Sequence, residues 1–437
     1  MDKLIVVIVK LLQVILKKKL QRLPNIMKNQ KLPSSIQLSG KFWKNRKEDF
    51  LQELGLAPLL GAHHDIYVSP VKNKKLEDLS DEVILKVFNF LELPDLIRCG
   101  LVSKRIRSVS FIESLWQKID ILNSDNSRKK IVSTELVKRI LNRSCKILRL
   151  RGCKVKGSLQ YSDFRLDSSY WSDQDKKNKD KQIKSFDYSG SNSSICEPTY
   201  EKGTQIASQL IHLDLTQCDI KHCVLRVLLT ACHSLKKLTL QNLLLPHYMF
   251  QRICSQNGPT LETLDLTFTR SSPFEFKSRD MRLIVKNCIR LKEVDFSGCR
   301  LSENCMILLI KNLSPNVEKV GLGAFGTDTE DKHIVALVSR CNKITSLNLA
   351  FRDDLTDISL TSIMKNLKFT LKELDIGRCE KITYGKLLEM RSMTKLEALN
   401  YSTYMYPGDY ETLKLTLPQL TNNNPWRQKW KDLGHNT

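Results

Sequence analysis

The chain has 437 residues and a formal net charge of +23 at pH 7, with 70 Lys and Arg against 47 Asp and Glu. This length permits two or three ordinary domains or one elongated array, so a sizeable apolar core is available. Part of the charge is local, because residues 1–75 hold fifteen Lys and Arg and only five Asp and Glu.

The thirteen cysteines include no CxxC pair, and no cysteine and histidine spacing fits a zinc site. This usage is typical of a reduced cytosolic or nuclear protein that uses Cys as a small core residue. The P-loop, HExxH and GxSxG motifs are also missing from the sequence. We therefore expect no catalytic residues, no cofactor and no metal, and a chain that works by binding.

The N-terminal segment MDKLIVVIVKLLQVILKKKL contains an apolar run from Leu4 to Leu16, thirteen residues that are interrupted by Lys10 and Gln13. A helix that spans a bilayer needs about 20 apolar residues. The KKK that follows also lacks the small-residue cleavage site of a secretory signal. We expect no membrane association, and a basic helix lying on a membrane surface stays the alternative.

Residues 1–75 as a whole are predicted to form a basic, mostly disordered arm with one short helix. Two basic clusters, 44–47 and 72–75, fit either a nuclear address or a solvated linker. The expected location of the protein is the nucleus and the cytoplasm.

The stretch LSDEVILKVFNFLELPDL, residues 79–96, begins as a helix with Ser80 as its N-cap and two acidic residues in its first turn. Pro94 ends this helix and can open a second one, expected over about 95–102. A third helix is expected from about Ser103 to the LW pair at 115–116.

The apolar residues between 83 and 91 occupy more than one side of the first helix, whereas a helix that lies on one core needs a single stripe. Three short helices also form too small a core to stand alone. A partner, or the rest of the chain, must cover the remaining apolar surface.

Residues 76–120 resemble the F-box family in the order and spacing of LSDEVIL from Leu79, VF, DL, VSKR from Val102 and the final LW. Ser80 stands where proline is usual, and Ile106 where tryptophan is usual. The resemblance implies that the domain binds a Skp-family adaptor, and through it a cullin. The residues implied at that interface are Leu79, Ile84, Leu85, Phe88, Leu91, Leu93, Pro94 and Trp116. The alternative is that several of these side chains only hold the three helices together.

Residues 121–406 repeat the template L-x-x-L-x-L-x-x-C/N about ten times, and most starts lie 25 to 30 residues apart. The matching segments begin at Cys145, Ile183, Leu210, Leu235, Leu261, Leu291, Val317, Ile344, Leu371 and Leu396. Each unit pairs a short strand with a helix and buries its leucines only by stacking on its neighbours. The predicted fold class is therefore α/β: a small all-helical F-box followed by a leucine-rich-repeat solenoid, a horseshoe arc with a parallel sheet inside and helices outside.

Seven cysteines fall at two fixed places in these repeats, which resembles the cysteine-containing subclass of leucine-rich repeats. We predict that they are buried free thiols: Cys153, Cys218, Cys232, Cys288, Cys299, Cys341 and Cys379. The polar run 168–181 exceeds the period and is predicted to be a loop insertion. Residues 407–437 form a basic, aromatic C-terminal tail, which the resemblance implies can fold back onto the array.

The fifth template position points out of the core toward the concave face, and five of its ten residues are Asp while one is basic. We therefore expect an acidic ribbon of Asp187, Asp214, Asp265, Asp295 and Asp375 that binds a basic segment of a protein substrate and repels nucleic acid. The alternative is that Asp is ordinary repeat consensus at this position. His212 also points toward the concave side, where a lone histidine is usually a surface contact.

F-box helices joined to such an array look like the substrate receptor of an SCF ubiquitin ligase, a complex of Skp adaptor, cullin and F-box protein. The resemblance implies a non-catalytic subunit that binds a protein substrate, and it leaves open whether that substrate is phosphorylated. The alternative is a repeat scaffold or inhibitor that has no role in ubiquitin transfer.

Overall fold

The computed structural model describes residues 80–401, apart from 90, 92, 124–128, 161–208, 272–275 and 324–328, together with 412, 415 and 416. Leu79, Asp187, the N-terminal arm, the predicted insertion and almost all of the tail lie outside the described residues. The chain divides into two compact units, Met1–Gln117 and Lys118–Thr437. Within the described residues, no helix has the length and apolar character needed to cross a membrane.

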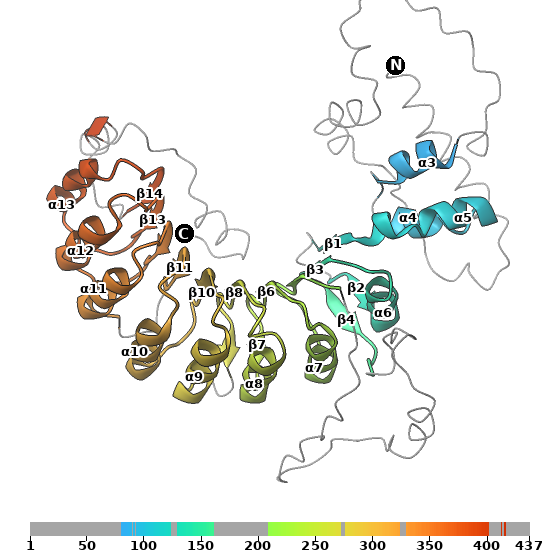
Figure 1. The fold of residues 1–437 in the computed structure, drawn as a ribbon, viewed down its shortest axis with the longest axis horizontal. Coiled ribbons are helices and arrows are strands. Elements are labelled where there is room, and N and C mark those ends of the chain that lie inside the picture. The colour runs from blue at the N-terminus through green and yellow to red at the C-terminus, as the bar shows by residue number, and fades with distance from the viewer. Residues whose placement is uncertain are drawn as a thin grey trace, which may run out of the picture. The chain divides into compact units, whose positions relative to one another are not determined.

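Among the described residues of the first unit there are four short helices, coloured blue to cyan in Figure 1: α3 (Asp81–Phe88), α4 (Leu93–Cys99), α5 (Lys104–Ser110) and the 3₁₀ helix η4 (Glu113–Trp116). Ser80 occupies the N-cap of α3 as predicted, although its side chain makes no capping hydrogen bond. Ser103 caps α5 by accepting a hydrogen bond from the backbone N–H of Ile106, at 3.2 Å. The second helix begins before the predicted start, at Leu93, and the predicted third helix is divided into α5 and η4.

The second unit is built on one ten-stranded parallel sheet, in the order β1-β3-β5-β6-β8-β10-β11-β12-β13-β14. Its strands are β1 (Lys118–Leu122), β3 (Ile147–Arg151), β5 (His212–Asp214), β6 (Lys237–Thr239), β8 (Thr263–Asp265), β10 (Glu293–Asp295), β11 (Lys319–Gly321), β12 (Ser346–Asn348), β13 (Glu373–Asp375) and β14 (Ala398–Asn400). Two short parallel ladders join β2 (Ile131–Ser133) to β4 (Lys154–Lys156) and β7 (Leu244–Leu245) to β9 (Arg270–Ser271).

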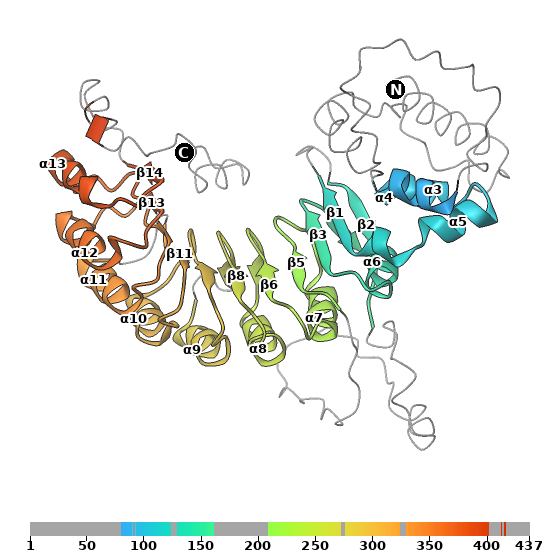
Figure 2. The same cartoon turned by 45° about the horizontal axis from the view of Figure 1, so that its top comes forward.

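Helices follow the strands and cover the outer side of the arc, while the main sheet lines its inner side, as Figures 1 and 2 show. The helices of this unit are α6 (Thr134–Leu141), α7 (His222–Ala231), α8 (His247–Gln256), α9 (Ser278–Asn287), α10 (Glu303–Asn312), α11 (Asp331–Arg340), α12 (Asp357–Leu367), α13 (Tyr384–Leu388) and the 3₁₀ helix η8 (Glu389–Ser392). The predicted solenoid, with its parallel sheet inside and helices outside, is confirmed.

Membership of the sheet differs from the prediction at its N-terminal end. β1 begins at Lys118, so the array starts before residue 121. β3 pairs directly with β5, with Arg149 opposite Asp214, and the repeat predicted from Ile183 lies outside the described residues. β1 was missed because WQKIDILNS carries Trp116, Ile119 and Ile121 where most of the other repeats carry leucine.

The core of the array consists of the template leucines, such as Leu210, Leu213 and Leu215, which have no exposed surface. All seven cysteines predicted to be core residues are buried free thiols, which confirms their assignment. The thiol of Cys299 donates to the carbonyl of Leu266 at 2.9 Å, and that of Cys379 donates to Leu349 at 3.2 Å. Cysteine therefore fills a small core position and also satisfies a carbonyl of the preceding repeat.

Candidate functional site

Four of the residues implied at the adaptor interface are buried in the F-box unit: Ile84, Phe88, Leu93 and Trp116. The indole N–H of Trp116 donates to the Ser110 carbonyl at 3.0 Å, and its ring stacks on Phe111 with the centroids 5.6 Å apart. These four side chains hold the short helices together, which is the alternative role that the sequence analysis considered for this set. In this conformation they offer little surface to a partner, and their implied role at the adaptor interface stays a prediction.

The surface of the same unit carries other apolar side chains. Leu85 and Leu91 are half-buried, and Pro94 is exposed, so these three implied residues remain available for contact. The sequence interpretation did not select Leu101 and Ile112, which are 50 % and 37 % exposed, and it placed Val83, 37 % exposed, only among the surplus apolar residues. These three come from α3, from the turn after α4 and from the turn before η4. Exposed apolar side chains of this kind are available to a partner that would remove them from water.

On the array, the fifth template positions do form one column across the sheet, as predicted. Direct pairing places Asp120 beside Arg149, Arg149 beside Asp214, and Asp265 beside Asp295. Thr239 separates Asp214 from Asp265, while Gly321 and Asn348 separate Asp295 from Asp375. The column therefore contains one directly adjacent pair of carboxylates and is not a continuous acidic ribbon.

Apart from Asp120, the carboxylates of this column are buried or half-buried. Asp214, Asp295 and Asp375 are only 9 %, 6 % and 3 % exposed, and Asp265 is half-buried. Each accepts a hydrogen bond from the backbone N–H two residues further along the chain. The acceptor oxygens lie 3.0 Å from Thr216 N, 3.1 Å from Thr267 N, 2.8 Å from Ser297 N and 3.1 Å from Gly377 N. The Asp side chains thus satisfy backbone donors where each strand ends.

Polar side chains link neighbouring members of the column. The amide of Gln241 donates to Asp265 at 2.6 Å, and that of Asn400 donates to Asp375 at 2.9 Å. Burial is the largest cause that raises the pKa of Asp214, although hydrogen bonds from Thr216 oppose it. The four described carboxylates are part of a buried hydrogen-bond network, so the predicted acidic, substrate-facing ribbon is wrong for them.

In the later strands, exposed charged side chains lie at the second and third template positions. From β8 onward, many of these lysines are paired with a neighbouring glutamate. Lys292 lies 3.0 Å from Glu262, Lys319 lies 3.5 Å from Glu293, and Lys372 lies 3.2 Å from Glu397. Exposed pairs of this kind add little stability, but they leave the surface electrically balanced.

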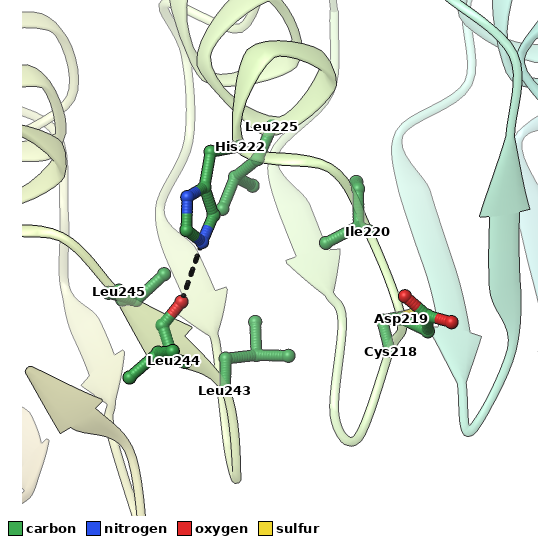
Figure 3. A pocket seen from close by; sticks show the side chains of 8 residues that line it. All are labelled: Cys218, Asp219, Ile220, His222, Leu225, Leu243, Leu244 and Leu245. Carbon is green, nitrogen blue, oxygen red and sulfur yellow. Dashed lines mark hydrogen bonds between the residues drawn. The ribbon is translucent and has the colours of Figure 1, made fainter. Parts of the chain in front are cut away.

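A small cleft of about 180 Å³ lies between two repeats, beside the start of α7 (Figure 3). Ile220, Leu243 and Leu244 line it together with His222, whose Nε2 lies 3.1 Å from the Leu244 carbonyl. Cys218 also lines the cleft, and burial raises the pKa of its thiol to about 12. That thiol is therefore protonated at neutral pH, and the cleft offers no activated cysteine nucleophile.

Two family models match the chain. One is described as F-box-like and covers residues 76–122, and the other is described as SKP2 LRR domain and covers residues 185–426, more than half of the chain. The chain is an F-box leucine-rich-repeat protein. F-box domains generally bind Skp1-type adaptors, and F-box leucine-rich-repeat proteins are typically non-catalytic adaptors.

Among solved structures, the F-box leucine-rich-repeat chain is similar to Leiomodin-1 Actin-Binding Site 2 (ABS2) at 23 % identity. The match covers 35 % of this chain and 92 % of that one, with a TM-score of 0.26. This similarity is too slight to bear on function.

Proposed function

We propose that this protein is the substrate-recognition subunit of an SCF-type ubiquitin ligase. Its F-box unit binds a Skp-family adaptor, and through it a cullin, while the repeat array binds the protein to be ubiquitinated. In this proposal the chain itself catalyses no reaction. The resulting ubiquitin transfer marks the bound protein for proteasomal degradation, and the complex works in the nucleus and the cytoplasm.

The observation that carries this proposal is the apolar surface of the F-box unit. Val83, Leu101 and Ile112 are all exposed, although the surrounding unit is a small set of short helices. Exposed apolar side chains stabilise a complex when a partner removes them from water, at about 25 cal/mol for each Å² buried. A Skp-type adaptor is the partner that F-box domains generally take.

The test introduces a charge at each of these exposed positions. The variants are Val83→Asp, Leu101→Asp and Ile112→Asp, made singly and combined in the full chain. Each should weaken copurification with a Skp-type adaptor, and the triple variant should weaken it by at least about tenfold. The reason is that a buried unpaired charge costs several kcal/mol. Since all three side chains already lie at the surface, the variants should keep the helical circular dichroism of the parent chain.

The matched control is Ile358→Asp on α12, where the isoleucine is 62 % exposed in the array. This variant makes the same chemical change outside the F-box and should retain full adaptor binding. Phe88→Ala tests the buried set and should destabilise the F-box by about 3 to 5 kcal/mol. Full adaptor binding by the folded triple variant would contradict the proposal.

A further inference from the structure

The helices on the outer side of the arc differ in charge along the array. α7, α8 and α9 pack side by side there, as Figures 1 and 2 show. These three helices contain a single acidic residue, Asp280, and it is only 1 % exposed. In contrast, α10, α11 and α12 each carry an acidic residue in the first turn. The charged side chains exposed on α7 to α9 are therefore all basic.

One arginine from each of these helices lies in a row across the outer surface. Arg226 is exposed as the fifth residue of α7, and Arg282 is exposed as the fifth residue of α9. Arg252 is half-buried as the sixth residue of α8, between them. Packed helices lie about 8 to 10 Å apart, which sets the spacing of the row. The row ends at α9, because the fifth residues of the next three helices are isoleucine, valine and threonine.

A second line of cations runs along α9 itself. Arg279, Arg282 and Lys286 are exposed and lie three and four residues apart, so they share one face of the helix. Arg290 is exposed just beyond the end of the helix, four residues after Lys286. We call the row and the line together the outer cationic face: Arg226, Arg252, Arg279, Arg282, Lys286 and Arg290.

Carboxylates do not balance most of these cations. Within the part of the chain that the structure describes, four members of the face form no ion pair: Arg226, Arg282, Lys286 and Arg290. Arg279 lies 3.8 Å from Asp280, but that carboxylate is buried and lies 2.5 Å from Nδ1 of His247. On α11, by comparison, the exposed Lys332 lies 2.8 Å from Glu303. The outer cationic face therefore has a surplus of positive charge that the later helices neutralise.

This placement of charge opposes the stability of α9. Arg282 and Lys286 are four residues apart, and like charges at that spacing repel each other on a helix surface. Arg279 lies in the first turn, where the helix dipole favours negative charge. An anionic partner would lie close to all three cations and would offset this repulsion.

We propose that the outer cationic face binds an acidic segment of a protein partner that also carries apolar side chains. Two exposed apolar residues accompany the cations: Tyr248 on α8 is 47 % exposed, and Ile289, just before Arg290, is 67 % exposed. Arginine and tyrosine are enriched at the centres of protein interfaces, and a guanidinium pairs with a carboxylate through two parallel hydrogen bonds. The proposed function assigns this outer surface neither to the adaptor nor to the substrate, so the inference goes beyond it.

A protein segment fits this face better than a nucleic acid or a membrane does. A nucleic-acid strand follows a continuous basic groove, and a membrane surface takes up a broad apolar face. The outer cationic face is short, because Glu303 begins the next helix, α10. Its exposed apolar residues, Tyr248 and Ile289, are single side chains that come from different helical turns. A short acidic segment can pair with the cations and cover these two side chains as well.

The test measures binding to the full chain. The probes are short degenerate peptides rich in Glu with scattered Leu and Phe, the same peptides with Gln in place of Glu, a poly(U) oligonucleotide and phosphatidylserine vesicles. We expect the Glu peptides to bind at least about tenfold more tightly than the Gln peptides, and this preference to weaken as salt screens the charges. Arg282→Glu combined with Lys286→Glu should remove most of the preference, as measured by fluorescence anisotropy.

The matched control is Lys365→Glu combined with Arg391→Glu, two exposed cations on α12 and η8. This variant has the same net charge as the double variant of α9, and it should bind the Glu peptides like the parent chain. Equal binding of Glu and Gln peptides, unchanged binding by the α9 double variant, or preferential binding of poly(U) or of the vesicles would each overturn the proposal.

Arg282→Glu alone separates loss of binding from loss of folding. It puts a glutamate four residues before Lys286, which is the favourable order for an ion pair on a helix. The melting temperature of this variant should therefore equal or exceed that of the parent chain, while its affinity for the Glu peptides falls. Parent-like affinity of this folded variant would count against the proposal.

Adaptor copurification with the same variants separates this inference from the proposed function. Variants of the outer cationic face should still copurify with the Skp-type adaptor. The triple Asp variant of the F-box should still bind the Glu peptides. Loss of peptide binding by the F-box variant would place the acidic-peptide site outside the outer cationic face and overturn the inference.

Discussion

Strands β1 to β6 and strands β8 to β14 share one parallel sheet and one repeat template, yet their charged side chains differ in burial and in pairing. In the later strands, Asp295 and Asp375 are buried and bonded to backbone N–H groups, while several surface lysines are matched by glutamates. In the early strands, Asp120 is exposed and shared by two arginines. The same fold thus buries the column carboxylate of β5, Asp214, like those of the later strands, whereas Asp120 on β1 meets solvent and two arginines.

The largest effect that would sharpen this comparison is expected at Gly321, beside Asp295 in the column. A Cβ on Gly321 would overlap the Asp295 carboxylate, which is fixed by its bond to Ser297 N. Gly321→Ala should therefore lower the free energy of unfolding by about 2 to 3 kcal/mol in denaturant titrations.

Asp295→Ala completes a double-mutant cycle with Gly321→Ala, because it removes the carboxylate that the new methyl group would meet. The double variant should be more stable than the sum of the two single changes predicts. Gly385→Ala is the control, because nothing lies within 4 Å of its added Cβ. Additive losses in the double variant would show that the two positions are not in contact.

A smaller effect compares the two kinds of aspartate directly. Asp295→Ala leaves the buried N–H of Ser297 without its acceptor, so a loss of about 1 to 3 kcal/mol is expected. Asp120→Ala removes only partly exposed ion pairs and should cost about 0 to 1 kcal/mol. Asp295→Asn keeps an acceptor oxygen and should fall between them. Equal losses for the two Ala variants, measured by thermal and denaturant unfolding, would erase the distinction between the regions.

The smallest expected effect is the pH dependence contributed by His212. Its folded pKa of about 4 lies below the ordinary histidine value of 6.5, so the unfolded chain binds the proton first as the pH falls. The stability from this group is therefore complete above pH 6.5 and is lost between pH 6.5 and about 4.

Because the ring is half-buried, the loss should be only about 1 to 2 kcal/mol after screening by solvent. His212→Gln cannot titrate, so the parent chain should lose more stability than this variant between neutral pH and pH 4.5. Parallel curves of melting temperature against pH for the two proteins would contradict the assigned role of His212.

The repeat period by itself determined most of the array. Residues at the first, fourth and sixth template positions must point inward, because no repeat can bury its apolar face without its neighbours. Leu210, Leu347 and Leu374 are buried accordingly, and the ninth-position cysteines are buried as well. The F-box pattern likewise predicted three short helical segments, since its N-caps and Pro94 act locally on the backbone.

Strand pairing was decided only by the tertiary structure. WQKIDILNS fits the nine-residue template only with Trp and Ile in the leucine positions. Nevertheless β3 pairs with β1 on one side and with β5 on the other. A short template tests one strand at a time, whereas a sheet position requires hydrogen bonds to two neighbours.

The sequence alone also could not predict the role of each outward-facing residue. The pattern placed Asp214 and Asp295 in one column, and pairing across the sheet confirms that column and adds Asp120 to it. Whether a carboxylate there meets solvent or a backbone N–H depends on the turn after its strand and on the side chains of adjacent repeats. Inward positions are fixed by the need of every repeat to bury leucine, while outward positions are fixed by neighbours that lie far apart in the chain.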